Sequence, residues 1–247
     1  MNSSPVQSPY TFQSKIKIFS DGADRASLLE MNGNPKIAGM TTNPSLMRKA
    51  GVTDYRGYCK EILTHVTEKP ISFEVFADEI AEMRRQALEI KTWGKNVYVK
   101  IPITNSKGES CLPLVKELSH SGVKLNITAL FTVDQVKGTC DAVKGGAPAF
   151  VSVFAGRLAD TGVDPMPLMK ASLELCRAAG PDVELLWAST REVYNIVQAE
   201  QMGCHIITAP ADIIKKLHSG FGKTAEALSL DTVQTFKKDS EAAGFKL

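Results

Sequence analysis

The chain has 247 residues, of which 43% are hydrophobic and 23% are charged, and its formal net charge is +2. This composition is ordinary for a globular domain, and so small a net charge gives no argument for a nucleic-acid partner or for an anionic membrane surface. No apolar run reaches the roughly 18 residues that a membrane-spanning helix needs, so the sequence predicts none.

The N-terminal segment and the cysteines indicate the cellular compartment. Residues 1–15 form a polar extension, and residues 1–13 lack the apolar segment of a secretory signal. The five cysteines are widely spaced and form no CxxC pair: Cys59, Cys111, Cys140, Cys176 and Cys204. This spacing favours buried thiols over a disulfide framework or a zinc site, so we expect a reducing, cytoplasmic location.

Strand-like and helix-like segments alternate along the rest of the chain. Strands are predicted at residues 16–20, 36–40, 71–76, 96–101, 123–129, 148–154, 183–188 and 204–208. Amphipathic helices are predicted between them, at residues 78–92, 108–121, 132–142, 165–178 and 190–202. Unbroken alternation is typical of a parallel sheet, and eight repeats in about 250 residues favour a closed (β/α)8 TIM barrel. We place this α/β barrel at residues 16–221.

A doubly wound open sheet is the alternative fold. A dinucleotide-binding sheet of that kind would carry a glycine-rich turn after its first strand, whereas this chain has Ser20-Asp21-Gly22-Ala23-Asp24 there. Residues 222–247 predict one amphipathic helix, which we expect to pack on the barrel within a single domain. A lid or a subunit contact is the alternative role for this helix.

Polar residues stand at the ends of most predicted strands, where barrels of this kind carry their catalytic groups. The first strand leads into Asp21, the third contains Glu74, and the fourth ends in Lys100. Burial at a strand end would favour the neutral form of a lysine, and a neutral amine can attack a ketone to form a Schiff base. A surface lysine at a strand end is the ordinary alternative.

The alternation of side chains along each strand predicts that the polar residues point into the barrel. Successive side chains alternate between the two faces of a strand, so Tyr98 and Lys100 share one face, as do Asn126 and Thr128. The aliphatic neighbours take the opposite face and can cover the helices. Because each unsatisfied buried polar group costs about 1–3 kcal/mol, several of them in consecutive strands indicate a polar site inside the barrel.

Structural roles remain open for single residues. Asp21 could cap the following helix, and Asn43 could form only an Asn-Pro turn. Thr128 could hydrogen-bond to the main chain, and Arg157 and Arg191 could form surface ion pairs. Glu74 is harder to explain in this way, because a lone carboxylate inside a strand is costly unless it is paired or protonated.

Six short motifs together resemble the transaldolase family, in the family's order, from about residue 16 to residue 217. The matching motifs are Gly39-Met-Thr-Thr-Asn-Pro-Ser45, Glu74 in its strand, Val99-Lys-Ile-Pro102, Leu125-Asn-Ile-Thr128, Ser152-Val-Phe-Ala-Gly-Arg157 and Ala188-Ser-Thr-Arg191. The resemblance implies a class I aldolase barrel that needs neither a metal nor an organic cofactor. The family's Schiff-base lysine lies on the fourth strand, as Lys100 does here.

The resemblance also implies a role for each matching residue. Lys100 would form the Schiff base, and Asp21 would take the proton of the donor hydroxyl as the carbon-carbon bond breaks. Glu74, helped by Thr128 and a held water, would transfer protons while the imine forms. The other matching residues would contact the substrate, namely Asn43, Asn126 and Ser152 at its hydroxyls, Phe154 beside them, and Arg157, Ser189 and Arg191 at its phosphate.

Two positions bear on the reaction. Relatives that release free dihydroxyacetone from fructose 6-phosphate usually carry Gln where this chain has Glu74, and Tyr where it has Phe154. The sequence therefore favours a transaldolase of the pentose phosphate pathway, which moves a dihydroxyacetone unit from sedoheptulose 7-phosphate to glyceraldehyde 3-phosphate. The alternatives are a fructose-6-phosphate aldolase, a non-catalytic sugar-phosphate binder, and a structural barrel.

The expected partners follow from this reading. They are phosphorylated sugars, with neither nucleic acid nor membrane, and a homo-oligomer is left open. The residues that flank Ser189 and the extension before the first strand depart from the family's habits, so the acceptor aldehyde is not fixed by the resemblance.

Overall fold

The computed structural model describes residues 14–247, apart from the side chain of His218. The described residues fall into two compact units, residues 14–214 and residues 215–247, and each is described by itself. The predictions for residues 1–13, a polar extension without a secretory signal, lie outside the described residues.

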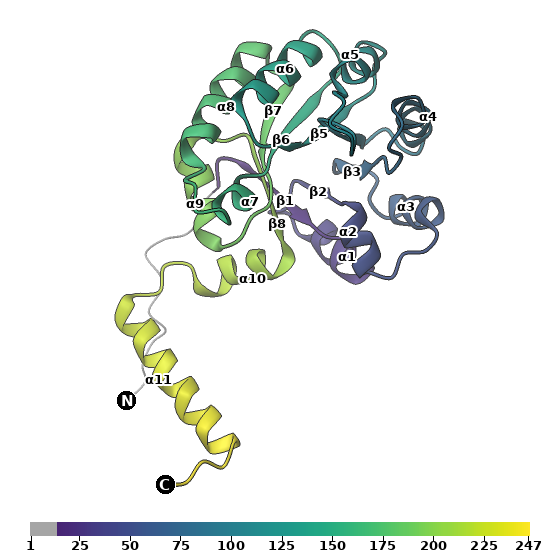
Figure 1. The fold of residues 1–247 in the computed structure, drawn as a ribbon. Coiled ribbons are helices and arrows are strands. Elements are labelled where there is room, and N and C mark those ends of the chain that lie inside the picture. Colours follow the sequence, from purple (N-terminus) through teal and green to yellow (C-terminus); the bar gives the residue numbers. More distant parts are fainter. Residues whose placement is uncertain (1–13) are drawn as a thin grey trace. The chain divides into compact units, whose positions relative to one another are not determined.

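Eight parallel strands close into a barrel in chain order, with β8 paired to β1 (Figure 1). The strands are β1 (Lys17–Asp21), β2 (Gly39–Thr41), β3 (Ile71–Glu74), β4 (Val97–Pro102), β5 (Leu125–Leu130), β6 (Ala149–Val153), β7 (Val183–Trp187) and β8 (Ile206–Pro210). The predicted (β/α)8 TIM barrel is therefore confirmed. Each predicted strand has its counterpart, although β2 is shorter than predicted.

Helices follow the strands along the chain. Their bounds are α1 (Arg25–Gly33), α2 (Pro44–Lys49), α3 (Tyr55–Leu63), α4 (Ile80–Lys91), α5 (Leu112–His120), α6 (Val133–Val143), α7 (Ala155–Ala159), α8 (Met166–Ala179), α9 (Val193–Met202) and α10 (Ala211–Gly220). The five helices predicted between strands correspond to α4, α5, α6, α8 and α9. The short helices α1, α2 and α3 were not predicted, and each begins at an Asx N-cap: Asp24, Asn43 and Asp54.

Helix α5 begins four residues later than predicted, at Leu112 rather than at residue 108. The preceding segment folds back on itself through an antiparallel bridge between Thr104 and Ser110. Gly108 lies in this turn with a φ of +81°, a conformation that glycine adopts without steric cost. A turn of this geometry cannot continue as an α-helix, so the prediction for residues 108–111 was wrong.

Aromatic side chains fill the interior of the barrel below the strand ends. The rings of Tyr98 and Phe150 stack at 3.9 Å between centroids, and Phe19 meets Phe150 edge-on at 5.6 Å. Leu186 and Ile206 complete this buried cluster. The polar residues of the same strands lie farther along, at the C-terminal ends, so the barrel has an apolar floor beneath a polar mouth.

The unit of residues 215–247 contains the predicted C-terminal helix. Helix α11 spans Ala225–Ala242, and the side chain of Thr224 caps it by accepting from the N–H of Ala227. That this helix packs on the barrel stays a prediction. No helix within residues 14–247 has both the length and the apolar character that crossing a bilayer demands.

Candidate active site

A cavity of about 130 Å³ opens at the C-terminal ends of the strands. Nine of the eleven predicted site residues line it: Asp21, Asn43, Lys100, Thr128, Ser152, Phe154, Arg157, Ser189 and Arg191. They come from six of the eight strands or from the segments that follow them, with none from β3 or β8. The fold therefore brings together residues that are up to 170 positions apart in sequence (residue 21 to residue 191).

Lys100 lines this cavity and is only 5% exposed. Its strand partner across the β3–β4 ladder is Glu74, and the lysine Nζ lies 3.2 Å from Glu74 Oε2. The same Nζ donates a hydrogen bond to the carbonyl oxygen of Thr42 at 3.1 Å. The amine is thus buried and directed between two acceptors. Glu74 does not itself line the cavity but contacts the lysine that does.

Asp21 stands at the end of β1 and is held by threonine hydroxyls. Thr41 Oγ1 donates to Asp21 Oδ1 at 2.6 Å, and the hydroxyls of Thr41 and Thr208 lie 2.7 Å apart. Burial raises the pKa of the Asp21 carboxyl above its ordinary value of 3.8, while the charge of Lys100 and the hydrogen bond from Thr41 oppose this rise. The helix that follows is capped by Asp24 instead, which leaves Asp21 free for the cavity.

Asn43 caps a helix and also lines the cavity. Its side-chain Oδ1 accepts from the N–H of Leu46 at 2.9 Å and so caps α2, with Pro44 in the first turn. Proline is well tolerated there, because its missing N–H would have no partner in the first turn. Asn43 also lines the cavity, and its contact with substrate hydroxyls stays a prediction.

Hydrogen bonds connect three strands behind the cavity wall. Asn126 Nδ2 donates to Ser72 Oγ at 2.9 Å, and Ser152 Oγ donates to Asn126 Oδ1 at 2.6 Å. Asn126 is fully buried and does not line the cavity, so it orients Ser152 from behind. Thr128 does line the cavity, and its buried Oγ1 has no hydrogen-bond partner among the described residues.

The β6–α7 and β7–α9 segments meet at the rim through a contact that only glycine permits. A Cβ on Gly156 would lie 1.6 Å from the carbonyl oxygen of Ser189. Ser189 itself has a φ of +65°, which is unusual for a residue with a Cβ. Backbone strain of this kind persists where the surroundings fix it, often at functional sites. Arg157 and Arg191 follow these two backbone positions, and both line the cavity.

The two arginines differ in their present partners. The guanidinium of Arg157 lies over the ring of Phe154, 5.3 Å from its centroid. The Nε of Arg191 lies 3.0 Å from both carboxylate oxygens of Asp160, and this contact lowers the pKa of Asp160. The ion-pair alternative thus holds for Arg191. An anion at this rim would meet Arg157 directly and would compete with Asp160 for Arg191.

Three polar residues of the site were not among the sequence-based predictions, and neither were the apolar lining residues Leu186 and Ala188. Thr41 and Thr208 line the cavity and position Asp21, and Asp160 binds Arg191. Thr41 belongs to the Gly39–Ser45 motif, so its place in the motif was a usable signal. No local pattern marks Asp160, which lies 31 residues from its partner. No group of three His, Cys, Asp or Glu side chains within residues 14–247 is arranged to hold a metal ion.

Comparison with known proteins agrees with this geometry. A family model described as Transaldolase/Fructose-6-phosphate aldolase matches residues 18–247. The chain is 34% identical to a probable transaldolase of Thermoanaerobacter sp. (strain X514), over 94% of this chain and 100% of that protein. It is 35% identical to a probable transaldolase of Dehalococcoides mccartyi (82% of this chain, 90% of the relative). A probable transaldolase of Methanococcus maripaludis (strain C5) is 36% identical (82% and 89%).

Proposed function

The chain belongs to the transaldolase/fructose-6-phosphate aldolase family, and we propose on this premise that it is a transaldolase. It moves a dihydroxyacetone unit from sedoheptulose 7-phosphate to glyceraldehyde 3-phosphate through a Schiff base on Lys100. The observation that carries the proposal is the lysine itself. Its side chain is buried and lines a polar cavity, with the Nζ 3.2 Å from a glutamate and within the electrostatic reach of a partly buried aspartate.

Formation of the imine needs a proton acceptor and a proton donor beside the amine. The nitrogen of Lys100 attacks the ketone carbon, and the resulting carbinolamine loses water once its hydroxyl is protonated. Glu74 is the nearest carboxyl group and can pass the proton taken from nitrogen to the departing hydroxyl. The unpartnered hydroxyl of Thr128 supports its role in holding the water molecule.

Cleavage of the carbon-carbon bond needs a base on the other side of the amine. Asp21 takes the proton of the donor hydroxyl, the bond breaks, and its electron pair moves into the protonated imine. The aldose phosphate leaves, and an enamine remains attached to Lys100. The same enamine then attacks the acceptor aldehyde, and hydrolysis of the new imine releases fructose 6-phosphate. A cavity of about 130 Å³ with a buried amine limits access of water to this intermediate.

The rim supports phosphorylated substrates. Planar guanidinium groups bind phosphate oxygens in pairs, and Arg157 and Arg191 both line the cavity beside Ser189. Phosphorylated sugars are therefore the proposed partners. A cytoplasmic location stays a prediction from the cysteines, and the pentose phosphate pathway and independence of any cofactor stay predictions of the resemblance.

Transfer is distinguished from simple aldol cleavage by the fate of the enamine. A coupled assay would measure erythrose 4-phosphate formed in the presence of the acceptor, and free dihydroxyacetone formed in its absence from fructose 6-phosphate. We expect transfer to exceed release clearly. Release at a rate equal to transfer would identify a fructose-6-phosphate aldolase, the second activity in the family's name.

A pair of substitutions tests which residues decide between the two activities. Phe154 has no hydroxyl that could protonate the enamine, and Glu74 is ionisable where aldolase-type relatives carry an amide. The double variant Phe154→Tyr/Glu74→Gln should therefore release more free dihydroxyacetone than the parent does. Unchanged release from a folded double variant would show that specificity is set elsewhere.

A further inference from the structure

The β2–β3 ladder stops just before Glu74. The N–H of Thr42 donates to the carbonyl oxygen of Ser72 at 3.2 Å. In a regular parallel ladder the N–H of Glu74 would next donate to the carbonyl of Thr42, and residue 44 would donate to the carbonyl of Glu74. Residue 44 is Pro44, which has no N–H. The carbonyl of Glu74 therefore needs another partner, and the N–H of Glu74 does not continue the ladder either, because it donates to a side chain.

A single tyrosine hydroxyl supplies that partner. Tyr55 Oη accepts from the N–H of Glu74 at 2.9 Å and donates to the carbonyl oxygen of Glu74 at 2.8 Å. Burial raises the pKa of Tyr55, so the hydroxyl keeps the proton that it donates. The carbonyl of Thr42, released from the ladder, accepts instead from the Nζ of Lys100 at 3.1 Å.

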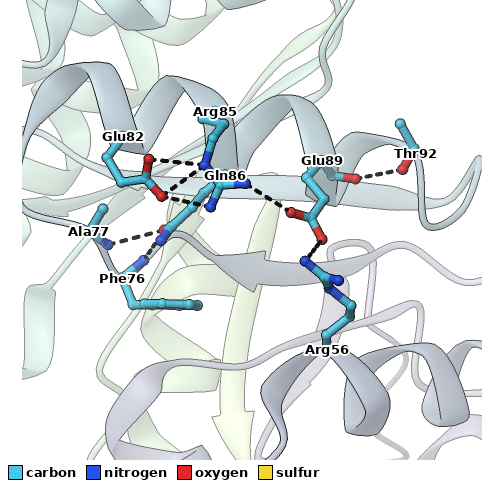
Figure 2. A network of polar contacts seen from close by, with 8 residues as sticks. All are labelled: Arg56, Phe76, Ala77, Glu82, Arg85, Gln86, Glu89 and Thr92. Atoms are coloured by element: carbon cyan, nitrogen blue, oxygen red, sulfur yellow. Dashed lines mark hydrogen bonds and ion pairs between the residues drawn. The ribbon is translucent and has the colours of Figure 1, made fainter.

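The backbone N–H groups of the three residues after Glu74 have hydrogen-bond partners of their own. The N–H of Val75 donates to the carbonyl of Lys100 at 3.0 Å. The N–H groups of Phe76 and Ala77 donate to Gln86 Oε1 at 2.9 and 3.1 Å, as Figure 2 shows. Within residues 14–247, the hydrogen bonds found for the backbone of Glu74 lead to Tyr55.

Tyr55 is itself held by packing and by an ion pair next to it. Its ring meets Phe76 edge-on at 5.3 Å and lies 6.2 Å from the ring of Trp93. The neighbouring Arg56 lies 2.6 Å from Glu89 and so connects α3 to α4 (Figure 2). The ring borders a second cavity of about 150 Å³. Removing only the hydroxyl leaves this packing in place.

We propose that Tyr55 is a positioning residue for Glu74, whose hydroxyl takes the place of β2 at the end of β3 and thereby sets the Glu74 carboxylate against Lys100. The kinetic consequence rests on the proposed function, whereas the placement of the strand end does not. Since a misplacement of about 1 Å can cost roughly 100-fold in rate, losing this contact should slow imine formation without weakening substrate binding.

The test is the variant Tyr55→Phe in the full chain. We expect kcat for transfer to fall by about 10- to 100-fold, with a KM for fructose 6-phosphate close to that of the parent. The matched control is Tyr98→Phe, which removes a tyrosine hydroxyl at the opposite end of the barrel and should leave kcat unchanged. A kcat for Tyr55→Phe equal to that of the parent would overturn the proposal.

A double-mutant cycle separates positioning from general destabilisation. If Tyr55 acts through the carboxylate, adding Tyr55→Phe to Glu74→Ala should lower kcat by less than about twofold, because coupled residues are not additive. An undiminished loss in the Glu74→Ala background would mean that Tyr55 acts by another route, and the proposal would fall.

Hydrogen exchange tests the placement without any assay of activity. The amide of Glu74 should exchange faster in Tyr55→Phe than in the parent or in Tyr98→Phe, and equal rates would contradict the contact. If the parent protein is inactive and forms no imine, the proposed function fails, and this exchange result alone decides on Tyr55. If the parent is active and the variant equals it in both measurements, only the inference about Tyr55 fails.

Discussion

The same strands build the floor and the mouth of the barrel interior, but the floor is apolar and the mouth is polar. In three strands an aromatic residue stands two positions before a polar residue that lines the cavity. The pairs are Phe19 and Asp21, Tyr98 and Lys100, and Phe150 and Ser152. Residues two apart face the same side of a strand. One step of about 7 Å along the strand therefore changes the interior from apolar to polar.

The difference shows where stability and function are separated in this fold. The floor gains free energy from burial and close packing of its rings. The mouth holds a buried lysine and a partly buried glutamate and aspartate, which is costly unless each is paired. The contact between Lys100 and Glu74 and the hydrogen bond from Thr41 to Asp21 offset part of that cost. Substitutions in the mouth should therefore lower activity, and substitutions in the floor should lower stability.

The largest effect is expected at Lys100. Lys100→Met removes the nitrogen that forms the imine, so turnover should be abolished while the barrel stays folded. The matched control is Lys124→Met, which makes the same change near the opposite end of the barrel, where the lysine Nζ binds the carbonyl of Lys95. Turnover and circular dichroism would be measured for both. Substantial activity in Lys100→Met would contradict its role as nucleophile.

Asp21→Asn should come next in its effect on activity. General acid-base groups contribute on the order of 100- to 10,000-fold to rate, and an amide cannot take the donor hydroxyl's proton. We expect kcat to fall within this range while the imine still forms on Lys100. If trapping of the imine were lost together with turnover, Asp21 would be needed for an earlier step.

The same substitution should raise stability, with a defined dependence on pH. Because burial raises the pKa of Asp21 above 3.8 in the folded state, the folded protein binds this proton more tightly than the unfolded chain does. The free energy of unfolding of the parent therefore falls as pH rises from about 3.8 through the native pKa. Urea unfolding of Asp21→Asn should show greater stability at neutral pH and convergence with the parent in acid. Equal stability at neutral pH would contradict the cost of the buried carboxylate.

The floor should respond in the opposite way. Phe150→Ala removes a buried ring that contacts both Phe19 and Tyr98, and such changes cost about 3–5 kcal/mol. Phe150→Leu keeps most of the volume and should cost less than about 1.5 kcal/mol. Denaturant unfolding measures both, and kcat of the folded fraction should change little. If a Phe150 variant lost activity at unchanged stability, the floor would not have the purely structural role assigned to it.

The smallest of these effects is expected at the rim. Arg157→Gln removes a guanidinium that could bind phosphate, and charge-assisted hydrogen bonds contribute about 1.5–3 kcal/mol, which corresponds to roughly 10- to 100-fold in KM. Arg191→Gln should raise KM less, because Arg191 must first give up Asp160. An acceptor without phosphate, such as glyceraldehyde, should be insensitive to either change. Equal losses with that acceptor would argue against a phosphate contact.

The barrel and most of the residues that line its cavity could be predicted, because they depend on local sequence patterns. Alternation within strands placed Lys100 on the inner face, and the predicted order of elements placed Asp21 and Arg191 at the same end. The short helix α3 was not predicted, although it is as long as α5, which was. The contact between Tyr55 and Glu74, 19 residues apart, depends on how α3 returns to β3. No local pattern encodes such a contact.

The most direct test of the account is reductive trapping of the imine. The parent protein would be treated with borohydride in the presence of fructose 6-phosphate, digested, and mapped by mass spectrometry. We predict a three-carbon adduct on the peptide that contains Lys100, and none on that peptide when the sugar phosphate is left out. An adduct on another lysine, or none at all from active protein, would contradict the central role of this buried amine.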